Sequence, residues 1–197
     1  MAYVAKAFTL PELPGISAKS VEEHIGLYNG YVKNFNAINA AIVEYMQDSA
    51  KHALALSELT RRKSFEFDGM RLHEIYFAQF EGKFMEPTDA SVLGKALAQQ
   101  YGTIEMAIEQ MKAVALMRGP GWSLLYWDPE AGEFHISFAG EQHQGHFATL
   151  PVVIALDVWE HAFILDYGAQ GKGKYIDAFF KNLNWSVLEE RFAPVQA

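Results

Sequence analysis

The first part of the chain carries the hydrophobic pattern of a long amphipathic helix. Between residues 20 and 46, apolar side chains recur every three or four positions, a spacing that gathers them on one face of an α-helix. Ser20 and Glu23 match the S-x-x-E pattern of a capping box, so we expect Ser20 to begin this helix. His24 lies on the same apolar face. A helix that buries this face therefore carries a histidine toward the core.

Two more helical patterns follow. The first covers residues 50–58, and the charged run at 61–69 then interrupts the period, which predicts a separate third helix from residue 70. His73 lies in that helix among aromatic residues. A single histidine on an apolar face is more often a packed core residue than a ligand. His24 and His73, taken one at a time, therefore indicate no site.

The second half of the chain mixes helices with strands. Its pattern predicts helices at 91–100, 103–117 and 178–192, the last broken at 184–185, and strands at 122–127, 133–138 and 152–156. Helices first, then a meander of strands flanked by helices, are typical of the α+β class. We expect an N-terminal helical hairpin over residues 1–83. A C-terminal subdomain over residues 88–197 is expected to hold a three-stranded antiparallel sheet flanked by helices.

The composition narrows the class of protein. The chain has 197 residues, half of them hydrophobic, which is enough for one domain or for two subdomains that share a core. It has no cysteine, so disulfides and thiolate metal sites are excluded. A net charge of −8 argues against nucleic-acid binding. No apolar run reaches the length of a membrane span and no signal peptide is visible, so we expect a cytoplasmic protein with no membrane partner.

Two candidate functional residues lie at and just after the end of the third predicted strand. The apolar run at 152–156 ends on Asp157, and His161 follows four residues later. The plain interpretation is an aspartate that caps a helix and a histidine that packs in the core. The alternative adds His24 and His73, which gives three nitrogen ligands and one oxygen ligand, a set that suits manganese, iron or zinc. The residues alone do not distinguish the two interpretations, and they do not identify which metal would bind.

Two longer motifs resemble those of a known family. Asp-Val-Trp-Glu-His at 157–161 and Gly-Pro-Gly-Trp at 119–122 are similar to signatures of the iron/manganese superoxide dismutases, and supporting matches occur at residues 8–14, 31–36, 175 and 184–185. The resemblance implies an enzyme that converts superoxide to dioxygen and hydrogen peroxide. It also implies one manganese or iron ion per chain, with a solvent molecule and four protein ligands, which are His24, His73, Asp157 and His161.

The resemblance further implies roles for residues around the metal. One glutamine of the family hydrogen-bonds the metal-bound solvent, and we expect Gln142 in that role, with His143 or Gln144 as alternatives if the loop register differs. Gly69 is expected to leave space beside the second ligand that Gln142 reaches, the arrangement of manganese members. Tyr31 is expected to gate the open face and relay protons.

Three more residues take their expected roles from the same resemblance. Trp122 and Trp159 are expected to keep the site dry and packed. Glu160 matches a glutamate of the family that crosses a dimer interface to the ligand histidine of the partner, the counterpart of His161. The resemblance therefore implies a homodimer, with a tetramer as an open alternative.

The chain departs from the family at the entrance to the site. Tyr28 stands where the family commonly has an outer histidine, and Ile164 replaces a tyrosine. The arginine of the usual Asn-x-Arg-Pro and the usual lysine near Leu27 are absent, and Lys172 or Lys174 is a candidate to replace the lost positive charge. These changes leave the four ligands in place but keep open the alternative of a catalytically weakened dismutase-like protein.

Two other classes stay open on the residues alone. One is a different mononuclear metalloenzyme, an iron oxygenase or a zinc hydrolase, with the same nitrogen and oxygen ligands. The other is a non-catalytic helical binding protein whose histidines belong to the core.

Overall fold

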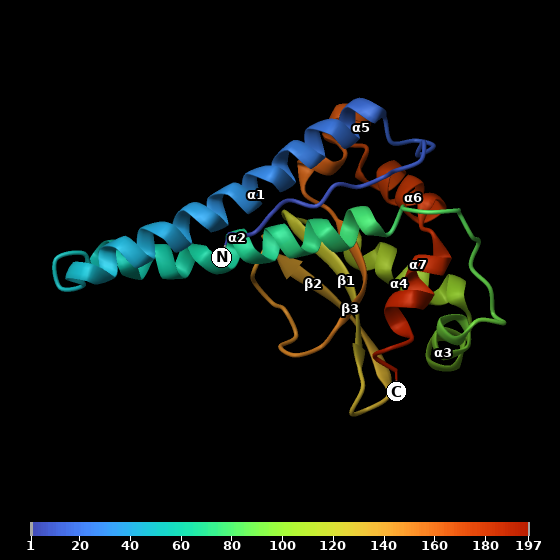
Figure 1. Cartoon of the computed structure of the whole chain (residues 1–197). Coiled ribbons are helices and arrows are strands. Elements are labelled where there is room, and N and C mark those ends of the chain that lie inside the picture. The colour runs from blue at the N-terminus through green and yellow to red at the C-terminus, as the bar shows by residue number, and fades with distance from the viewer. Residues whose placement is uncertain (1, 197) are drawn as a thin grey trace.

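The computed structural model describes residues 2–196, and two long antiparallel helices form its N-terminal half (Figure 1). They are helix α1 (Ala18–Tyr45) and helix α2 (Ala53–Ala78), joined through the short 3-10 helix η1 (Met46–Asp48). Both helices bury side chains only near the body of the protein, from residue 20 to 38 in α1 and from 66 to 77 in α2. The rest of the hairpin, residues 39–65, projects from the body as an arm in which no side chain is buried.

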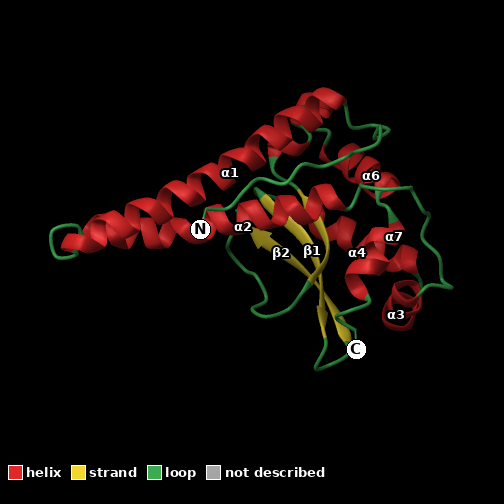
Figure 2. Ribbon diagram, viewed as in Figure 1, coloured by secondary structure: helices red, strands yellow, loops and turns green. Residues whose placement is uncertain are grey.

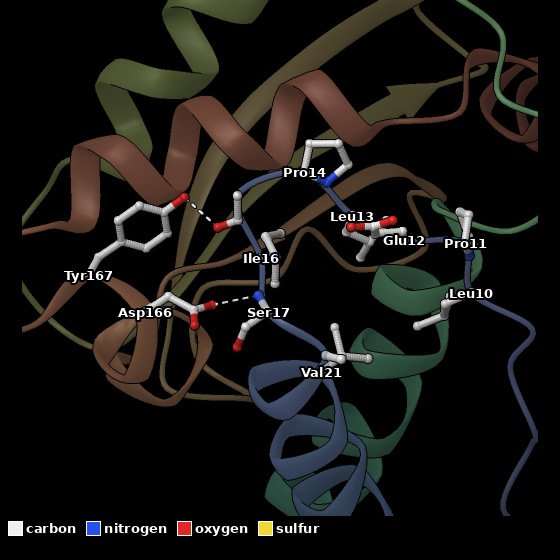
Figure 3. Close-up of a pocket in the computed structure, with 12 residues that line it drawn as sticks. Leu10, Pro11, Glu12, Leu13, Pro14, Ile16, Ser17, Val21, Asp166 and Tyr167 are labelled. Atoms are coloured by element: carbon white, nitrogen blue, oxygen red, sulfur yellow. Dashed lines mark hydrogen bonds between the residues drawn. The ribbon is translucent and has the colours of Figure 1, made fainter.

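Helix α1 begins earlier than its hydrophobic pattern predicts. Its N-cap is Ser17, whose side chain accepts a hydrogen bond from the backbone N–H of Ser20 at 3.1 Å. The expectation that Ser20 begins the helix was therefore wrong. Asp166 accepts a bond from the backbone N–H of Ser17 at 2.9 Å (Figure 3). The Tyr167 hydroxyl donates to the carbonyl of Gly15, and both segments line a pocket of about 690 Å³. These contacts with residues 166 and 167, far along the chain, determine where α1 starts.

Helix α2 is continuous, so the expected break at residues 61–69 was wrong. Its charged residues pair within the helix. Arg61 lies 2.6 Å from Glu58, and Arg62 lies 2.8 Å from Glu66. Pairs three or four residues apart stabilise a helix without an apolar stripe. The interrupted hydrophobic period therefore marks where the helix leaves the body of the protein, not where it ends.

The C-terminal half holds a small sheet with helices packed around it (Figure 2). The strands are β1 (Gly121–Asp128), β2 (Glu133–Gly140) and β3 (Val152–Asp157). The helices are α3 (Val92–Tyr101), α4 (Ile104–Ala115), η2 (Glu160–Ala162), α5 (Ile164–Tyr167), α6 (Lys172–Asn182) and α7 (Trp185–Phe192). The strand order is β2-β1-β3, and both neighbouring pairs are antiparallel. The predicted α+β class with a helical hairpin and a three-stranded antiparallel sheet is confirmed.

The last helical region differs from its prediction at one end. Asn184 accepts a bond from the N–H of Ser186 and caps α7, so the expected break at 184–185 is confirmed. Helix α6, however, begins at Lys172 and not at residue 178. The first turn of α6 carries no large apolar side chain and therefore shows no hydrophobic period before Tyr175.

Polar side chains join the hairpin to the sheet close to where the candidate ligands lie. Gln79, directly after α2, exchanges two hydrogen bonds with the backbone of Ala155 in β3, each at 2.8 Å. Arg191 in α7 donates to the carbonyls of Val153 and Ile75, at 2.8 and 3.1 Å. Since buried polar groups are costly to leave unpaired, these bonds fix the separation of α2 and β3.

One hydrophobic core runs through both halves and includes Tyr28, Phe77 and Trp122. The division into subdomains over residues 1–83 and 88–197 stays a prediction.

Candidate metal centre

Four side chains from distant parts of the sequence meet between the hairpin and the sheet. His24 of α1, His73 of α2, Asp157 at the end of β3 and His161 of η2 each offer one ligand atom, and these atoms all lie within 4.8 Å of one another. The Nε2 atoms of His161, His24 and His73 lie 3.0, 3.2 and 3.5 Å from Oδ2 of Asp157. The structure therefore brings together all four candidate ligands from the sequence.

The elements around the cluster hold each side chain in place. Asp157 pairs in register with Trp122 of the central strand, and its Oδ1 accepts a bond from the backbone N–H of Trp159 at 2.8 Å. That bond leaves Oδ2 facing the histidines. The rings of His24 and His73 lie edge to face with centroids 4.9 Å apart, where the two helices of the hairpin enter the body.

The protonation states of the histidines suit metal binding. Nδ1 of His73 bonds the carbonyl of Gly69 at 2.6 Å, so Nδ1 carries the proton and Nε2 keeps its lone pair. Burial lowers the pKa of His73 to about 3, and burial also lowers the pKa of His24. Nε2 of His73 is buried and has no hydrogen-bond donor among residues 2–196. A buried acceptor without a donor is unusual, and a cation in the cluster would satisfy it.

The carboxylate completes the donor set. Burial by itself raises the pKa of Asp157, but the charge and hydrogen bond of His161, with those of His24, outweigh it and hold the pKa well below its usual range. Asp157 is therefore ionised at neutral pH, while the fully buried His73 is neutral. Three imidazoles and one carboxylate, without sulfur, fit an iron, manganese or zinc ion.

Gln142 contacts two side chains, Trp122 and Tyr31, that pack against His73 of this cluster. Its side chain is fully buried, its Oε1 accepts from the indole N–H of Trp122 at 2.8 Å, and its Nε2 donates to the Tyr31 hydroxyl at 2.9 Å. The alternatives lie elsewhere. His143 packs its ring against Phe65 with centroids 5.5 Å apart, and Gln144 is exposed.

Gly69 makes room beside the second ligand, but a tyrosine ring fills that room. A Cβ atom on Gly69 would lie 2.6 Å from Cδ1 of Tyr31, closer than any real contact. The Tyr31 ring in turn lies over His73, with centroids 5.1 Å apart. Gln142 therefore reaches the hydroxyl of Tyr31, not the space beside Gly69.

The two tryptophans and Tyr28 lie in different surroundings. Trp122 meets the edge of His73 at 5.1 Å between centroids, and Trp159 stacks on His161 at 5.9 Å. The Tyr28 hydroxyl is engaged away from the cluster, where it accepts from the backbone N–H of Lys6 at 2.8 Å and bonds Glu74 at 3.2 Å. A role for Tyr28 at the entrance stays a prediction.

Sequence reasoning missed some neighbours of the ligands. Tyr76 packs its ring against His24, with centroids 4.9 Å apart, and its hydroxyl lies 3.1 Å from that of Tyr175. Tyr76 lies three positions after His73, so helical spacing on the ligand face was the signal that could have found it. His146, which bonds the backbone of Gln142, carried no such signal.

Comparisons with known proteins agree with this geometry. The sequence model described as "Iron/manganese superoxide dismutases, C-terminal domain" matches residues 89–191. An iron superoxide dismutase of Aquifex pyrophilus is 33% identical over 186 residues, 91% of this chain and 85% of that protein. One of Cupriavidus metallidurans is 33% identical, over 92% of this chain and 91% of that protein. A mitochondrial manganese superoxide dismutase of Glossina morsitans morsitans is 29% identical, over 94% and 88%. This chain belongs to the iron/manganese superoxide dismutase family.

Proposed function

We propose that this chain is a superoxide dismutase, which converts two superoxide anions and two protons into dioxygen and hydrogen peroxide at one iron or manganese ion. The observation that carries the proposal is the cluster of three histidines and one aspartate, whose ligand atoms all lie within 4.8 Å of one another. Membership of the family supports the reaction, because its relatives are named for superoxide dismutation with iron and with manganese.

The proposed ligands are His24, His73, Asp157 and His161. The bond from His73 to the Gly69 carbonyl selects the tautomer that turns a lone pair toward the ion. The backbone N–H of Trp159 orients Asp157, whose negative charge offsets part of the metal charge. When bound by these four residues, the ion would supply one-electron redox chemistry for the two superoxide anions.

Hydrogen peroxide carries two protons, and Tyr31 with Gln142 is the proposed route for them. Burial first, then the negative charges of Asp157 and Glu66, raises the pKa of Tyr31 well above its ordinary value, so Oη keeps its proton at neutral pH. Gln142 donates to Oη, which leaves the Tyr31 O–H free to bond another acceptor. Tyr31 can therefore hold a proton at Oη and pass it on.

The aromatic side chains around the ligands are proposed to keep bulk water out. His73 is fully buried beneath Trp122, and Trp159 covers one face of His161. A dry, low-dielectric site strengthens the electrostatic interactions of Asp157 and of the proton donors.

The entrance is proposed to lie beside His161, the most exposed of the four ligands. His161 is 21% exposed and borders a cavity of about 750 Å³ that Arg118 and Lys172 also line. Arg118 and Lys172 bring positive charge to this cavity, which Glu160 also lines, so the cavity is less negative than the chain as a whole, whose charge is −8. Lys172 is therefore the better candidate of the two lysines named from the sequence.

A homodimer closed through Glu160 is part of the proposal. Glu160 is exposed and makes no side-chain hydrogen bond within residues 2–196, and His161 uses only Nε2 toward Asp157. In a two-fold dimer each Glu160 can accept a hydrogen bond from Nδ1 of the opposite ligand histidine, a contact that occurs twice.

Glu160→Ala is expected to weaken both the dimer, measured by analytical ultracentrifugation, and metal binding, measured by metal analysis. A wild-type protein that sediments as a monomer at micromolar concentration rules this out; a tetramer requires a second interface.

We also propose that, of iron and manganese, manganese is the preferred metal. This proposal rests on the residue types expected of manganese members, glycine at position 69 and glutamine at position 142, and not on the space beside Gly69, which the Tyr31 ring fills. Iron relatives such as that of Aquifex pyrophilus stand against a strict preference. Activity measured after reconstitution with each metal decides it, and a protein active only with iron overturns the manganese preference.

A cytoplasmic location stays a prediction. No helix within residues 2–196 is long and apolar enough to cross a membrane. Cell fractionation tests the location.

The experiment that tests the function combines metal analysis with a superoxide assay. Purified wild-type protein is expected to hold about one iron or manganese ion per chain and to dismutate superoxide. A zinc-bound protein that hydrolyses esters, or an iron protein that consumes dioxygen with an organic substrate, would replace the proposal by another metalloenzyme. A metal-loaded protein with activity far below that of its relatives would identify a weakened dismutase-like protein.

A further inference from the structure

The loop that carries Gln142 has an unusual backbone. Gly140 and Gln144 exchange two backbone hydrogen bonds, at 2.9 and 3.1 Å, which closes the loop tightly after β2. Glu141 has a φ of 52° and Gly145 a φ of 83°, both in the left-handed region. For Glu141 such a conformation costs free energy and persists only where surrounding contacts hold it. The contacts around this loop therefore decide where the Gln142 side chain lies.

Two bonds hold Glu141, but neither acts on Gln142 itself. The backbone N–H of Glu141 donates to the carbonyl of Pro120 at 3.2 Å, and the Trp159 indole donates to the carbonyl of Glu141 at 3.4 Å. The backbone carbonyl of Gln142 instead accepts from Nε2 of His146 at 2.9 Å. Within residues 2–196, His146 is the group that bonds this carbonyl.

His146 is itself tied to the rigid centre of the sheet. Its Nδ1 lies 2.8 Å from the hydroxyl of Tyr126, a residue of β1 that is 1% exposed. A neutral imidazole with its proton on Nε2 satisfies both bonds, since Nε2–H donates to Gln142 and Nδ1 accepts from Tyr126. Gly145 turns the chain so that His146 comes back over Gln142.

We propose that His146 is a positioning residue for Gln142, which it anchors to Tyr126 of the central strand. The proposal rests on the proposed function, because Gln142 matters through its bonds to Trp122 and Tyr31. The order of bonds runs from Tyr126 through His146 to the Gln142 carbonyl, and from the Gln142 amide to Trp122 and Tyr31. Without His146 the strained loop relaxes and the amide leaves its two partners.

The first test reads the position of Gln142 without any metal. The Trp122 indole N–H donates to Gln142 Oε1, so its ¹H–¹⁵N NMR resonance in the metal-free full-length chain reports on that bond. His146→Leu is expected to move this resonance in the direction that Gln142→Ala moves it. His135→Leu is the matched control, because the ring of His135 lies against Phe147, on which Tyr126 also stacks, but makes no hydrogen bond to Gln142 within residues 2–196. A Trp122 resonance that moves in Gln142→Ala and stays in place in His146→Leu overturns the proposal.

The second test measures catalysis in the metal-loaded enzyme. His146→Leu is expected to lower kcat about tenfold with KM and metal content unchanged, as expected for a misplaced group near the reacting atoms. His146→Gln keeps a donor and an acceptor and is expected to recover part of the rate. If His146→Leu does not fold, Tyr126→Phe removes only the anchoring hydroxyl, and an unshifted Trp122 resonance in that variant overturns the proposal. A wild-type protein without dismutase activity refutes the proposed function, while the NMR result still decides the role of His146.

Discussion

The two ends of the helical hairpin share the same pair of helices but differ in what holds them. At the body end, α1 and α2 bury side chains from residues 20–38 and 66–77, including His24 and His73. In the arm, residues 39–65, no side chain is buried. The arm stays helical through intrinsic propensity, in alanine-rich sequence, and through pairs such as Arg61 with Glu58.

Forming a helix and fixing side chains for a binding site therefore have different requirements in this hairpin. Either end of the hairpin can form a helix from local interactions, but only the body end fixes the side chains that a site requires. Ligand residues must be held by packing, because a histidine on a mobile, solvated helix pays the full entropy of ordering when it binds a metal. The arm therefore offers control positions that match those of the body end in residue type.

Two histidines give the largest expected difference. His73→Ala is expected to abolish metal binding and activity, since three remaining ligands lose the geometry and the donor count. His52→Ala in the arm removes a ring that stacks on Tyr45, with centroids 4.5 Å apart, away from the cluster, and is expected to leave metal binding and activity unchanged. Metal content by elemental analysis and dismutase activity check the pair. Equal metal content in the two variants would remove His73 from the ligand set.

Two glutamines of the same loop come next. Gln142→Ala is expected to keep the metal but lower activity by roughly 10- to 100-fold, in the range seen when the partners around a metal site are removed. Gln144→Ala is expected to keep wild-type activity, because Gln144 is exposed and uses its backbone to close the loop. The reverse pattern of activities would assign the expected glutamine role to Gln144.

Two glycines sharpen the comparison of packing. Gly69→Ala places a methyl group 2.6 Å from the Tyr31 ring and is expected to lower the free energy of unfolding by about 1–3 kcal/mol. A Cβ atom on Gly30 meets nothing outside its own turn of helix within 4 Å among residues 2–196, so Gly30→Ala is expected to raise the free energy of unfolding by about 0.5–1 kcal/mol, since alanine is the better helix former. Urea denaturation of both variants measures the difference, and a destabilised Gly30→Ala would contradict the assigned space.

The smallest effect is expected in the arm itself. Leu54 is 86% exposed, so Leu54→Lys is expected to change the free energy of unfolding by less than about 0.5 kcal/mol. The same urea experiment measures it. A loss above 2 kcal/mol would mean that the arm is covered in solution, and the oligomeric state of the variant would then show whether a second copy covers it.

Sequence alone predicted most of the metal centre. Period and motif located the two helical histidines, the strand ending on Asp157 and the loop of Gln142, because buried faces and family motifs leave a direct trace in residue order. The start of α1 was wrong because Asp166, far along the chain, holds Ser17 in place. The break in α2 was wrong because a helix outside the body needs no apolar stripe.

Only the tertiary structure decided how the residues around the ligands are used. Local spacing cannot show that the Tyr31 ring occupies the room beside Gly69, that Tyr28 turns its hydroxyl toward Glu74, or that His146 bonds the Gln142 carbonyl. Each of these contacts joins segments from different elements or a loop folded back on itself, and their geometry depends on packing across the whole core. Sequence by itself, through the family motifs, determined which four residues to expect in the His-Asp cluster; the packing of the hairpin against the sheet decided what each neighbour contacts.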